Sequence, residues 1–437
     1  MKPLRLSIAC LALVAFARAA AADDFIERLD DYLAVSAFHG FLRARVSGLL
    51  DVEGYYVTQP APGLIETDHD FLFNPRLTLF LDAQAGTHVY AFAQARLDRG
   101  FDPQDGGAQV RLDEYALRVS PWADGSFNVQ VGKFATVVGN WVPRHHSWED
   151  PFITPPLPYS NVTAISDKRA PSSPQDFLAN SGKPGAEGEY TAGDDDDEDD
   201  DDSDEYSTPS AAARSEKYER NPIIWGPSYT SGLSLFGRIG KFDYAAEVKN
   251  ASLSSPPDSW DASETGFEHP TFSSRLGFRP NEMWNLGFSA SAGPYLLPEA
   301  ASTLPAGYGI GDYRELLLGQ DISFAWHHLQ FWAECYETRF QVPTVGNADT
   351  VAWYLEAKYK FTAQLFGALR WNQQLFATVP DGEGDRDPWG NNIWSVDIAA
   401  GYRFTPYTQL KLQYSLSHQD SVSAYSNTIA AQFTVRF

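Results

Sequence analysis

The residues of this chain that could do chemistry are charged side chains at every second position of strand-like segments. Successive side chains of a β-strand point to opposite faces, so residues two apart share a face. Over residues 392–404, Asp397 and Arg403 lie on one face, whereas Trp394 and Ile398 lie on the other. If such strands enclose a lumen, the charged face acts on ions and polar solutes that pass through it.

The basic residues on these charged faces are the candidates for lining a pore. They are Arg43, Arg45, Arg76, Arg96, Arg118, Arg238, Arg275, Arg279, Lys358, Lys360, Arg370, Arg403 and Lys411. Lys249 and Arg436 share the pattern, and the acids assigned to the same faces are Asp82, Asp98, Glu114, Asp243, Glu247, Glu315, Asp321, Glu334, Glu356 and Asp397. The basic excess predicts a preference for anions at a constriction, because fixed charge acts strongly in a narrow passage. The alternative is that paired charges only hydrate a general lumen.

The segments that must position these charges predict an all-β fold, a transmembrane antiparallel up-and-down β-barrel of about 16 strands. No apolar run beyond the first 22 residues is long enough for a spanning helix. Connections between the segments alternate between short and long, as expected when short turns lie on one side of a membrane and long loops on the other. The predicted strands are 40–53, 71–82, 88–98, 110–120, 127–136, 229–239, 242–250, 271–279, 284–293, 312–326 and 329–340, and five more begin near 351, 365, 392, 410 and 427.

The last eleven residues alternate most clearly and end on an aromatic residue. Ile429, Phe433, Val435 and Phe437 share the apolar face, and Gln432 lies on the polar face. This pattern resembles the C-terminal assembly signal of bacterial outer-membrane barrels, and the resemblance assigns that role to Phe433, Val435 and Phe437. The alternative is an ordinary edge strand of a soluble sheet.

The amino terminus predicts export. Lys2 and Arg5 precede an apolar run over residues 6–16, and small residues at 20–22 offer a cleavage site, so residues 1–22 read as a signal peptide. Residues 23–39 form a periplasmic segment whose apolar residues have helical spacing, which predicts a short helix. The mature chain then keeps one cysteine, Cys335, which excludes a disulfide within the chain.

The third long loop, residues 137–228, is by far the longest. It contains a proline-rich stretch at 151–159 and later an acidic low-complexity run at 194–205. Connections of this length are functional or disordered. We expect the first third to fold into the pore and the acidic run to be solvated, with divalent-cation binding by its carboxylates as the alternative. The barrel proper would span 40–437.

Other reactive residues give weak signals. His145, His146, Glu149 and Asp150 could hold zinc, but hydrogen bonds that pin the loop to the wall are the preferred interpretation. Ser417 and His418 are neighbours in a strand, so their side chains point to opposite faces and do not form a catalytic pair. The sequence therefore predicts no enzyme, no metal and no cofactor.

The composition favours a membrane barrel. The chain has 28 Phe, 21 Tyr and 12 Trp among 437 residues, a supply of aromatic rings that suits two girdles at the membrane interfaces. The formal net charge of −24 argues against binding to nucleic acid.

Together, sixteen strands, an oversized third loop and the terminal Phe437 resemble the trimeric porins of Gram-negative outer membranes. Val131-Gly132-Lys133-Phe134, before the proline-rich stretch, resembles the phosphate-selective group of porins. The resemblance implies passive diffusion of small hydrophilic solutes, a homotrimer, and lipid, lipopolysaccharide and the barrel-assembly machinery as partners. Two alternatives stay open: a sheath or export conduit around a cytochrome or polysaccharide, and an outer-membrane enzyme.

Overall fold

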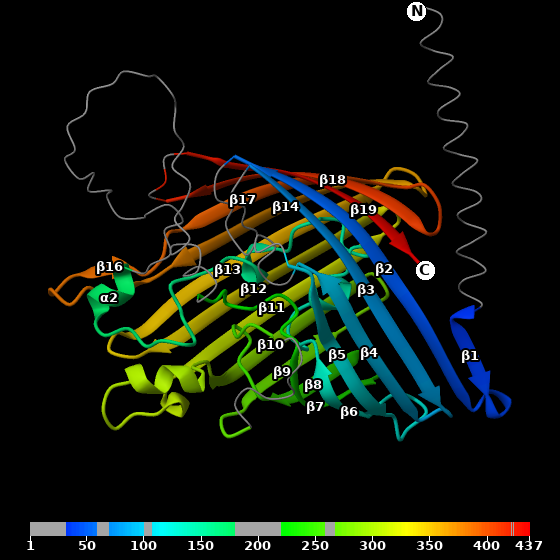
Figure 1. The fold of residues 1–437 in the computed structure, drawn as a ribbon, viewed down its shortest axis with the longest axis horizontal. Helices are drawn as coiled ribbons and strands as arrows, with labels where there is room; N and C mark the ends of the chain where they lie inside the picture. The colour runs from blue at the N-terminus through cyan, green and yellow to red at the C-terminus, as the bar shows by residue number, and fades with distance from the viewer. Residues whose placement is uncertain are drawn as a thin grey trace, which may run out of the picture.

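The protein forms one antiparallel barrel that closes on itself (Figure 1). The computed structural model describes residues 32–58, 70–99, 107–179, 220–257, 267–420, 422 and 424–437. The signal peptide predicted at 1–22 and the acidic run at 194–205 lie outside these ranges. Sixteen strands make up the barrel, and the pairing of the last strand, β19, with the first, β2, closes it. The predicted fold class is confirmed.

The barrel strands follow the chain order, each beside its predecessor. They are β2 (Leu42–Val57), β3 (Phe71–Ala85), β4 (Val89–Asp98), β5 (Gln109–Val119), β6 (Asn128–Phe134), β7 (Thr230–Ile239), β8 (Phe242–Lys249), β9 (Thr271–Phe278), β10 (Trp284–Pro294), β11 (Arg314–Trp326), β12 (Leu329–Val342), β13 (Gly346–Lys360), β14 (Leu365–Phe376), β17 (Ile393–Arg403), β18 (Thr408–Gln419) and β19 (Ser426–Arg436).

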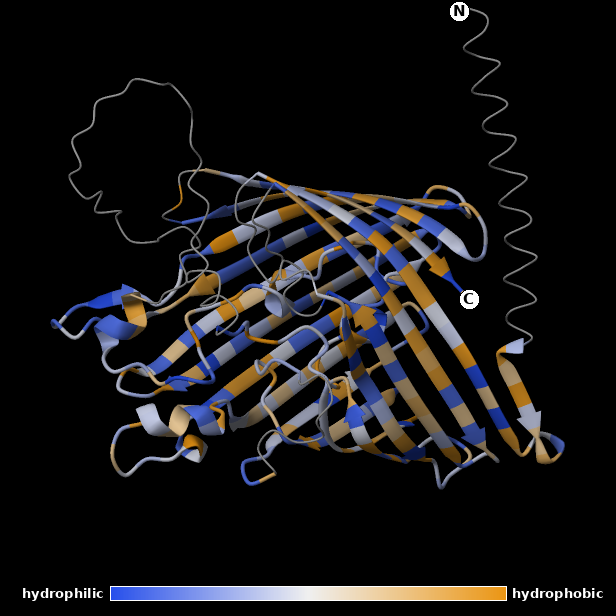
Figure 2. Ribbon diagram, viewed as in Figure 1, coloured by the Kyte–Doolittle hydropathy of each residue, from blue (hydrophilic) through white to orange (hydrophobic). Residues whose placement is uncertain are grey.

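The two-residue period of the sequence sets which side chains face outward. In β19, Ile429 and Phe433 are exposed on the outer surface, whereas Gln432 and Thr434 are buried against the interior. Apolar and polar residues alternate along most of the strands in Figure 2. No helix in the described ranges is long and apolar enough to cross a membrane.

The connections alternate in length as predicted. Those at one end of the barrel are short, at 86–88, 120–127, 240–241, 279–283, 327–328, 361–364 and 404–407. Most of those at the other end are longer; the exceptions are 420–425 and 343–345, and at the latter β12 and β13 themselves extend. One long loop contains a small hairpin of β15 (Thr378–Pro380) and β16 (Arg386–Pro388), and short helices in the loops are η3 (Val142–Arg144), η4 (Leu157–Tyr159), α2 (Pro174–Ala179), η5 (Pro298–Thr303) and η6 (Ile310–Asp312).

Most of the segment 23–39, for which the sequence predicts a short helix, lies outside the described residues, and only 32–39 are described. Ala34–Ala37 is a strand, β1, that pairs with the first residues of β2, and a single turn of 3₁₀ helix, η1 (Phe38–Gly40), joins the two. The physical reason is the free edge of β2. β2 extends beyond the end of β19, so the backbone N–H and C=O groups at its start have no partner on β19. They form hydrogen bonds with β1 instead.

The seam of the barrel ends on Phe437. The backbone N–H of Gly48 donates to the Phe437 carbonyl oxygen at 2.9 Å, and the Phe437 N–H donates to the Gly48 oxygen at 3.1 Å. The Phe437 ring lies across Gly48, where any Cβ would overlap it. A glycine at position 48 therefore makes room for the terminal ring.

We expect Gly48→Ala to reduce the yield of folded barrel, because the added methyl group displaces the Phe437 ring from the seam. Heat-modifiable migration in gel electrophoresis after refolding measures that yield. Gly54→Ala is the matched control, since Gly54 lies on the same strand and a Cβ there would make only an ordinary contact, 3.5 Å from Phe71. Equal yields for the two variants would contradict this role for Gly48.

Candidate solute passage

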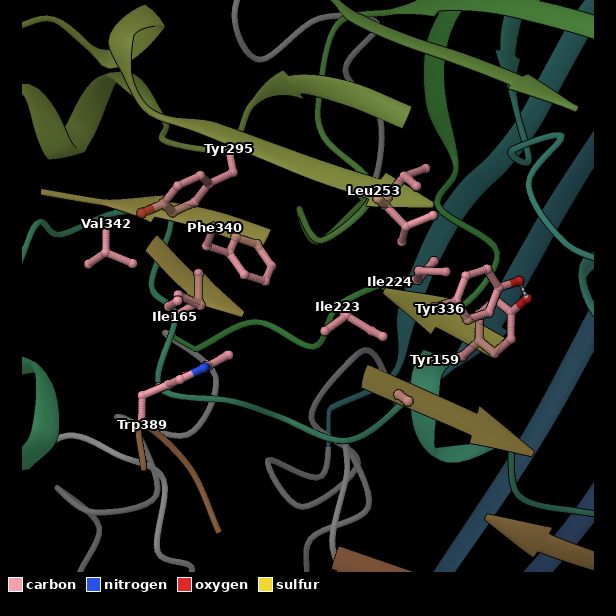
Figure 3. Close-up of a cluster of buried hydrophobic side chains, with 14 of the residues drawn as sticks. Tyr159, Ile165, Ile223, Ile224, Leu253, Tyr295, Tyr336, Phe340, Val342 and Trp389 are labelled. Carbon is pink, nitrogen blue, oxygen red and sulfur yellow. Dashed lines mark hydrogen bonds between the residues drawn. The ribbon is translucent and has the colours of Figure 1, made fainter. Parts of the chain in front are cut away.

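The described parts of the long loop between β6 and β7 fold into the barrel and bind its inner wall. The Glu334 carboxylate on β12 accepts hydrogen bonds from the backbone N–H groups of Asn140 and Trp141 and from the Tyr159 hydroxyl, the last at 2.6 Å. The Tyr159 hydroxyl also lies 2.7 Å from that of Tyr336 (Figure 3). This carboxylate thus fixes two turns of the loop against one strand.

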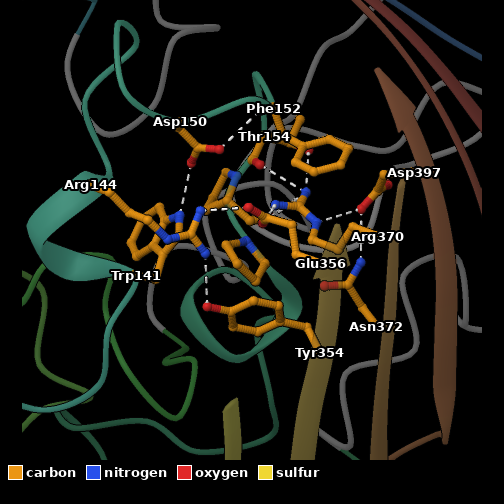
Figure 4. Close-up of polar contacts among 12 residues, drawn as sticks. Trp141, Arg144, Asp150, Phe152, Thr154, Tyr354, Glu356, Arg370, Asn372 and Asp397 are labelled. Carbon is orange, nitrogen blue, oxygen red and sulfur yellow. Dashed lines mark hydrogen bonds and ion pairs between the residues drawn. The ribbon is translucent and has the colours of Figure 1, made fainter. Parts of the chain in front are cut away.

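A second anchor uses buried charge (Figure 4). Arg144 of the loop donates to Glu356 on β13 at 2.5 Å and to the Tyr354 hydroxyl at 3.1 Å. Its guanidinium group also lies 4.4 Å from the centroid of the Trp332 ring, a cation–π distance. The ion pair is shielded from water, because Glu356 is fully buried.

In a third anchor the donors and acceptors are exchanged: the wall supplies the cationic donors, and the loop supplies the acceptors. Arg370 on β14 pairs with Asp397 on β17 at 2.8 Å and donates to the Thr154 carbonyl oxygen, also at 2.8 Å. Lys411 on β18 donates to the carbonyl oxygens of Asp150 and Phe152 at 3.0 and 2.9 Å. Both cations are almost completely buried, so they hold the loop backbone rather than face open solvent.

An apolar core fills the space between the loop and strands β11–β13. Ile165, Ile223 and Ile224 of the loop pack with inward residues of the wall such as Phe340 and with Trp389 from another long loop (Figure 3). This core is dry, because its members are almost without exposed surface. The open part of the lumen therefore lies on the other side of the loop.

That open part is a cavity of about 290 Å³ between the loop and strands β2–β5 and β17–β19. Trp141, Phe152 and Trp225 contribute aromatic surface from the loop. The charged side chains that line it are six carboxylates and three guanidinium groups: Asp51, Glu53, Asp98, Asp113, Asp150, Asp397, Arg76, Arg96 and Arg111.

The guanidinium groups of the cavity are all paired on the wall. Arg76 bridges Asp51 at 3.1 Å and Glu53 at 2.6 Å. Arg96 binds Asp113 at 2.8 Å, and Arg111 binds Asp98 at 2.6 Å. Each arginine thus faces the cavity with its charge largely balanced by a neighbouring strand.

The structure divides the predicted pore-lining residues into three groups. Arg76 and Arg96 line the cavity. Arg370, Arg403 and Lys411 bind the loop; Arg403 donates to the Trp148 carbonyl oxygen at 3.2 Å. The others lie elsewhere on the inner face or toward the short-turn end: Arg43, Arg45, Arg118 beside Gln130, Arg238 beside Gly240, Arg275 with Asp243 and Asp321, Arg279 with Asp243, Lys358 over the Phe366 ring, and Lys360.

Sequence reasoning missed several charges of the cavity. Asp51 and Glu53 share a face with Arg43 and Arg45, so the two-residue period alone could have assigned them inward. Asp113 could not be assigned in this way, because the pairing of β4 and β5 shifts register between Gln94 and Ala95. Such a bulge reverses the facing of the residues beyond it.

The two loop histidines lie beside the cavity as neutral side chains. His145 Nδ1 lies 2.5 Å from the Val142 carbonyl oxygen, so this nitrogen carries the proton, and Nε2 accepts from the Tyr229 hydroxyl at 2.6 Å. Burial lowers the pKa of His145 to about 4. Burial, then the electrostatic effect of the nearby His145, also lowers the pKa of His146, whose ring lies tilted against that of His145 with 4.0 Å between the ring centroids. These contacts hold the start of the loop near the wall.

Solved structures with similar folds include outer-membrane proteins of three bacteria. OmpF of Salmonella typhi, in complex with daunomycin, is similar at a TM-score of 0.54 and 10% identity over 92% of this chain and all of that one. An anion-selective porin of Comamonas acidovorans gives 0.52 and 10% over 91% and 100%. OmpT of Vibrio cholerae in a trimer form gives 0.52 and 9% over 91% and 99%. No protein-family description and no curated protein sequence matches the chain.

The chain has the fold of the outer-membrane porins. The similarity extends over 91–92% of this chain. At about 10% identity it shows the porin fold alone. The role of the loop anchors is therefore inferred from the contacts within this chain and not from the similar structures.

We expect Arg370→Met to lower the free energy of unfolding by about 3–5 kcal/mol, because it leaves the buried Asp397 carboxylate without its cation. Urea unfolding in detergent measures the change. Arg238→Met is the control, since Arg238 is exposed and only reaches the Gly240 carbonyl oxygen. Adding Asp397→Asn to Arg370→Met should restore part of the loss, and a loss that is unchanged would contradict the ion-pair explanation.

Acid should loosen the loop. The pKa of His145 is about 4 in the folded protein against 6.5 unfolded, so the folded form binds fewer protons between these values. Docking is therefore fully stable above about pH 6.5 and loses stability as the pH falls toward 4. Hydrogen-exchange protection of residues 138–159 at pH 7 and pH 4.5 tests this. His145→Gln should reduce the pH dependence, whereas His327→Gln, in an exposed turn, should not.

Proposed function

We propose that the protein is an outer-membrane channel through which small hydrophilic solutes diffuse passively. The observation that carries the proposal is the cavity of about 290 Å³ left beside the anchored loop, lined by charges and aromatic rings inside a closed barrel. A passage of this kind needs no energy source and no cofactor. The basic and acidic residues of β2–β5 are the proposed lining.

The sign of its ion preference is a separate step of the proposal. The basic excess of the sequence predicts an anion preference, and one structurally similar porin is described as anion-selective. In this chain, however, six carboxylates and three guanidinium groups line the cavity, and each guanidinium group is paired. The balance at the passage itself favours cations, weakly, over anions.

The cavity also bears on the conduit alternative. A sheath around a cytochrome or polysaccharide needs a wide and continuous lumen, but the loop and its apolar core occupy one side of the barrel. The remaining space suits a small molecule and not a folded partner. Passive diffusion is therefore the better supported proposal.

The proposal includes no enzymatic step. Ser417 lines the cavity, whereas the neighbouring His418 stacks on Trp394 of the outer face. The two side chains therefore lie on opposite sides of the wall, and they cannot act together as nucleophile and base.

Placement and assembly complete the proposal. The signal-like amino terminus and the C-terminal residues Phe433, Val435 and Phe437 support export and insertion by the barrel-assembly machinery. One of the structurally similar proteins is a trimer form, which supports a homotrimer. Lipopolysaccharide is the proposed lipid partner on the side of the long loops.

Single-channel recording in a planar bilayer under a salt gradient tests the proposal. We expect discrete conductance steps and a reversal potential of cation sign. Asp113→Asn should shift that potential toward anion selectivity, because it removes one lining carboxylate and releases Arg96 from its pair. Glu337→Gln, on the outer face, is the control and should shift nothing.

The two parts of the proposal fail separately. A wild-type reversal potential of anion sign would reject the cation preference and restore the expectation from the sequence. A folded barrel that shows no conductance would reject the channel.

A further inference from the structure

The inner wall carries a buried carboxylate that has no cationic partner in the described part of the chain. Glu315 lies near the start of β11, faces the interior and is 3% exposed. Its Oε2 atom accepts hydrogen bonds from the Ser254 hydroxyl at 2.7 Å and from the Ser254 backbone N–H at 3.3 Å. Its Oε1 atom is buried and has no hydrogen-bond partner among the described residues. Other buried carboxylates of this wall, such as Glu356 and Asp397, are paired with arginines.

The basic residue in the same row of the sheet is engaged elsewhere. The row crosses β8 to β11 through Lys249, Thr271, Gly293 and Glu315. The Lys249 ammonium group donates to the Phe134 carbonyl oxygen on β6 at 2.5 Å. It therefore extends to the side of β8 away from β11, and its charge does not compensate that of Glu315.

A second oxygen without a partner lies beside this carboxylate. Thr271 at the start of β9 is 2% exposed, and its hydroxyl makes no hydrogen bond within the described ranges. The hydroxyl lies where a side chain at Gly293 would be, and Gly293 stands directly opposite Glu315 in the register of β10 and β11. Side chains that are directly opposite begin about 5 Å apart. One ion can therefore contact both the Thr271 hydroxyl and Oε1 of Glu315.

The side chains that surround Glu315 from the loop after β8 are hydroxyls. Ser252 Oγ lies 3.0 Å from both Ser254 Oγ and Ser255 Oγ, and all three serines are almost fully buried. Oxygen ligands suit hard cations, and tight calcium sites combine several carboxylates. The described residues contain no group of three His, Cys, Asp or Glu side chains that could hold a metal. A site with one carboxylate and hydroxyls thus matches an ion of single charge.

We propose that Glu315 Oε1 and the Thr271 hydroxyl bind one monovalent alkali cation, sodium or potassium, behind the loop residues 250–257. The ion supplies the positive charge that the buried carboxylate lacks, and it gives a ligand to both oxygens that have no other. Sodium and potassium share this chemistry, and the test below distinguishes them. The inference concerns the wall and not the passage, so it does not depend on the proposed channel.

A proton on Glu315 does not satisfy the site equally well. Oε2 already accepts two hydrogen bonds, so the proton would be on Oε1, which has no described acceptor within hydrogen-bond distance. Protonation would then exchange an unpaired acceptor for an unpaired donor. A water molecule could donate to Oε1, but it would leave the negative charge uncompensated. A cation resolves both problems.

The bound ion holds a loop that supports the apolar core. Ser254 ties the loop to Glu315, and its neighbour Leu253 belongs to the core (Figure 3). The Leu253 carbonyl oxygen accepts from the Trp225 backbone N–H at 2.8 Å. Trp225 is part of the long loop between β6 and β7 and lines the cavity. The cation therefore stabilises the contact between two loops inside the barrel.

The test uses the full-length barrel refolded in detergent and N-methylglucamine chloride, with NaCl or KCl exchanged in at constant ionic strength. Urea unfolding measures the ratio of folded to unfolded protein. Because only the folded site binds the ion, this ratio at the alkali-free midpoint should rise at least about threefold at saturating Na⁺ or K⁺. Glu315→Gln and Thr271→Val should abolish the rise. Glu337→Gln, on the outer face, and Thr230→Val, at a buried hydroxyl that also has no partner among the described residues, are the matched controls and should keep it.

Anomalous scattering from crystals soaked in thallous acetate locates the ion directly, because Tl⁺ substitutes for K⁺. We expect a peak in contact with Glu315 Oε1 in the wild type and no peak there in Glu315→Gln. A wild-type crystal without that peak would reject the site. This measurement also decides the question if Glu315→Gln does not fold.

Four results of the unfolding experiment would overturn the proposal. Wild-type stability that ignores Na⁺ and K⁺ would mean that no ion binds. An equal rise in Glu315→Gln and the wild type would place the ion elsewhere. Stability that increases as the pH falls but does not respond to alkali cations would assign the site to a proton. A larger response to Ca²⁺ than to Na⁺ or K⁺ at equal concentration would reject a monovalent ion.

Discussion

The constraint on which this structure depends is the pairing of backbone groups where no water is present. In hydrocarbon, an unpaired N–H or C=O group is costly, so a spanning sheet must close on itself. β19 pairs with β2 to achieve this, and the final residue, Phe437, exchanges both backbone hydrogen bonds with Gly48. Where β2 runs past the end of β19, β1 continues the pairing.

Closure of the barrel creates an interior in which charged side chains of the wall and the loop are buried. A buried ion is tolerated only with a partner, and the inner wall supplies partners across strands that are distant in sequence, as in Arg144 with Glu356 and Arg370 with Asp397. Glu356 also lies 3.9 Å from Arg370, so the two anchors share one carboxylate. The loop therefore belongs to the same electrostatic network as the wall that it covers.

The sequence predicts those features of the structure that depend on residues close together in the chain, and it does not predict those that depend on residues far apart. The two-residue period is local, and it correctly predicted the sixteen strands, their order and the outward face of residues such as Ile429 and Phe433. The period could also have assigned Asp51 and Glu53. It could not assign Asp113, because a bulge is set by the pairing of two strands, nor the partner of Arg144, which lies more than two hundred residues away. A count of charged residues in the sequence therefore does not predict the net charge that faces the cavity, because the count ignores which charges form ion pairs.

The apolar core inside the barrel determines on which side of the anchored loop a passage can lie. Ion pairs alone would leave water between loop and wall, and water would let solutes and ions pass on both sides. Residues such as Ile165, Ile223 and Phe340 remove that water, so one side of the lumen is sealed by packing. In the proposed channel, the charges beside the remaining cavity are then the ones that a solute meets next to the loop. Under the proposed function, selectivity accordingly depends on hydrophobic packing on one side of the loop as much as on the charges on the other side.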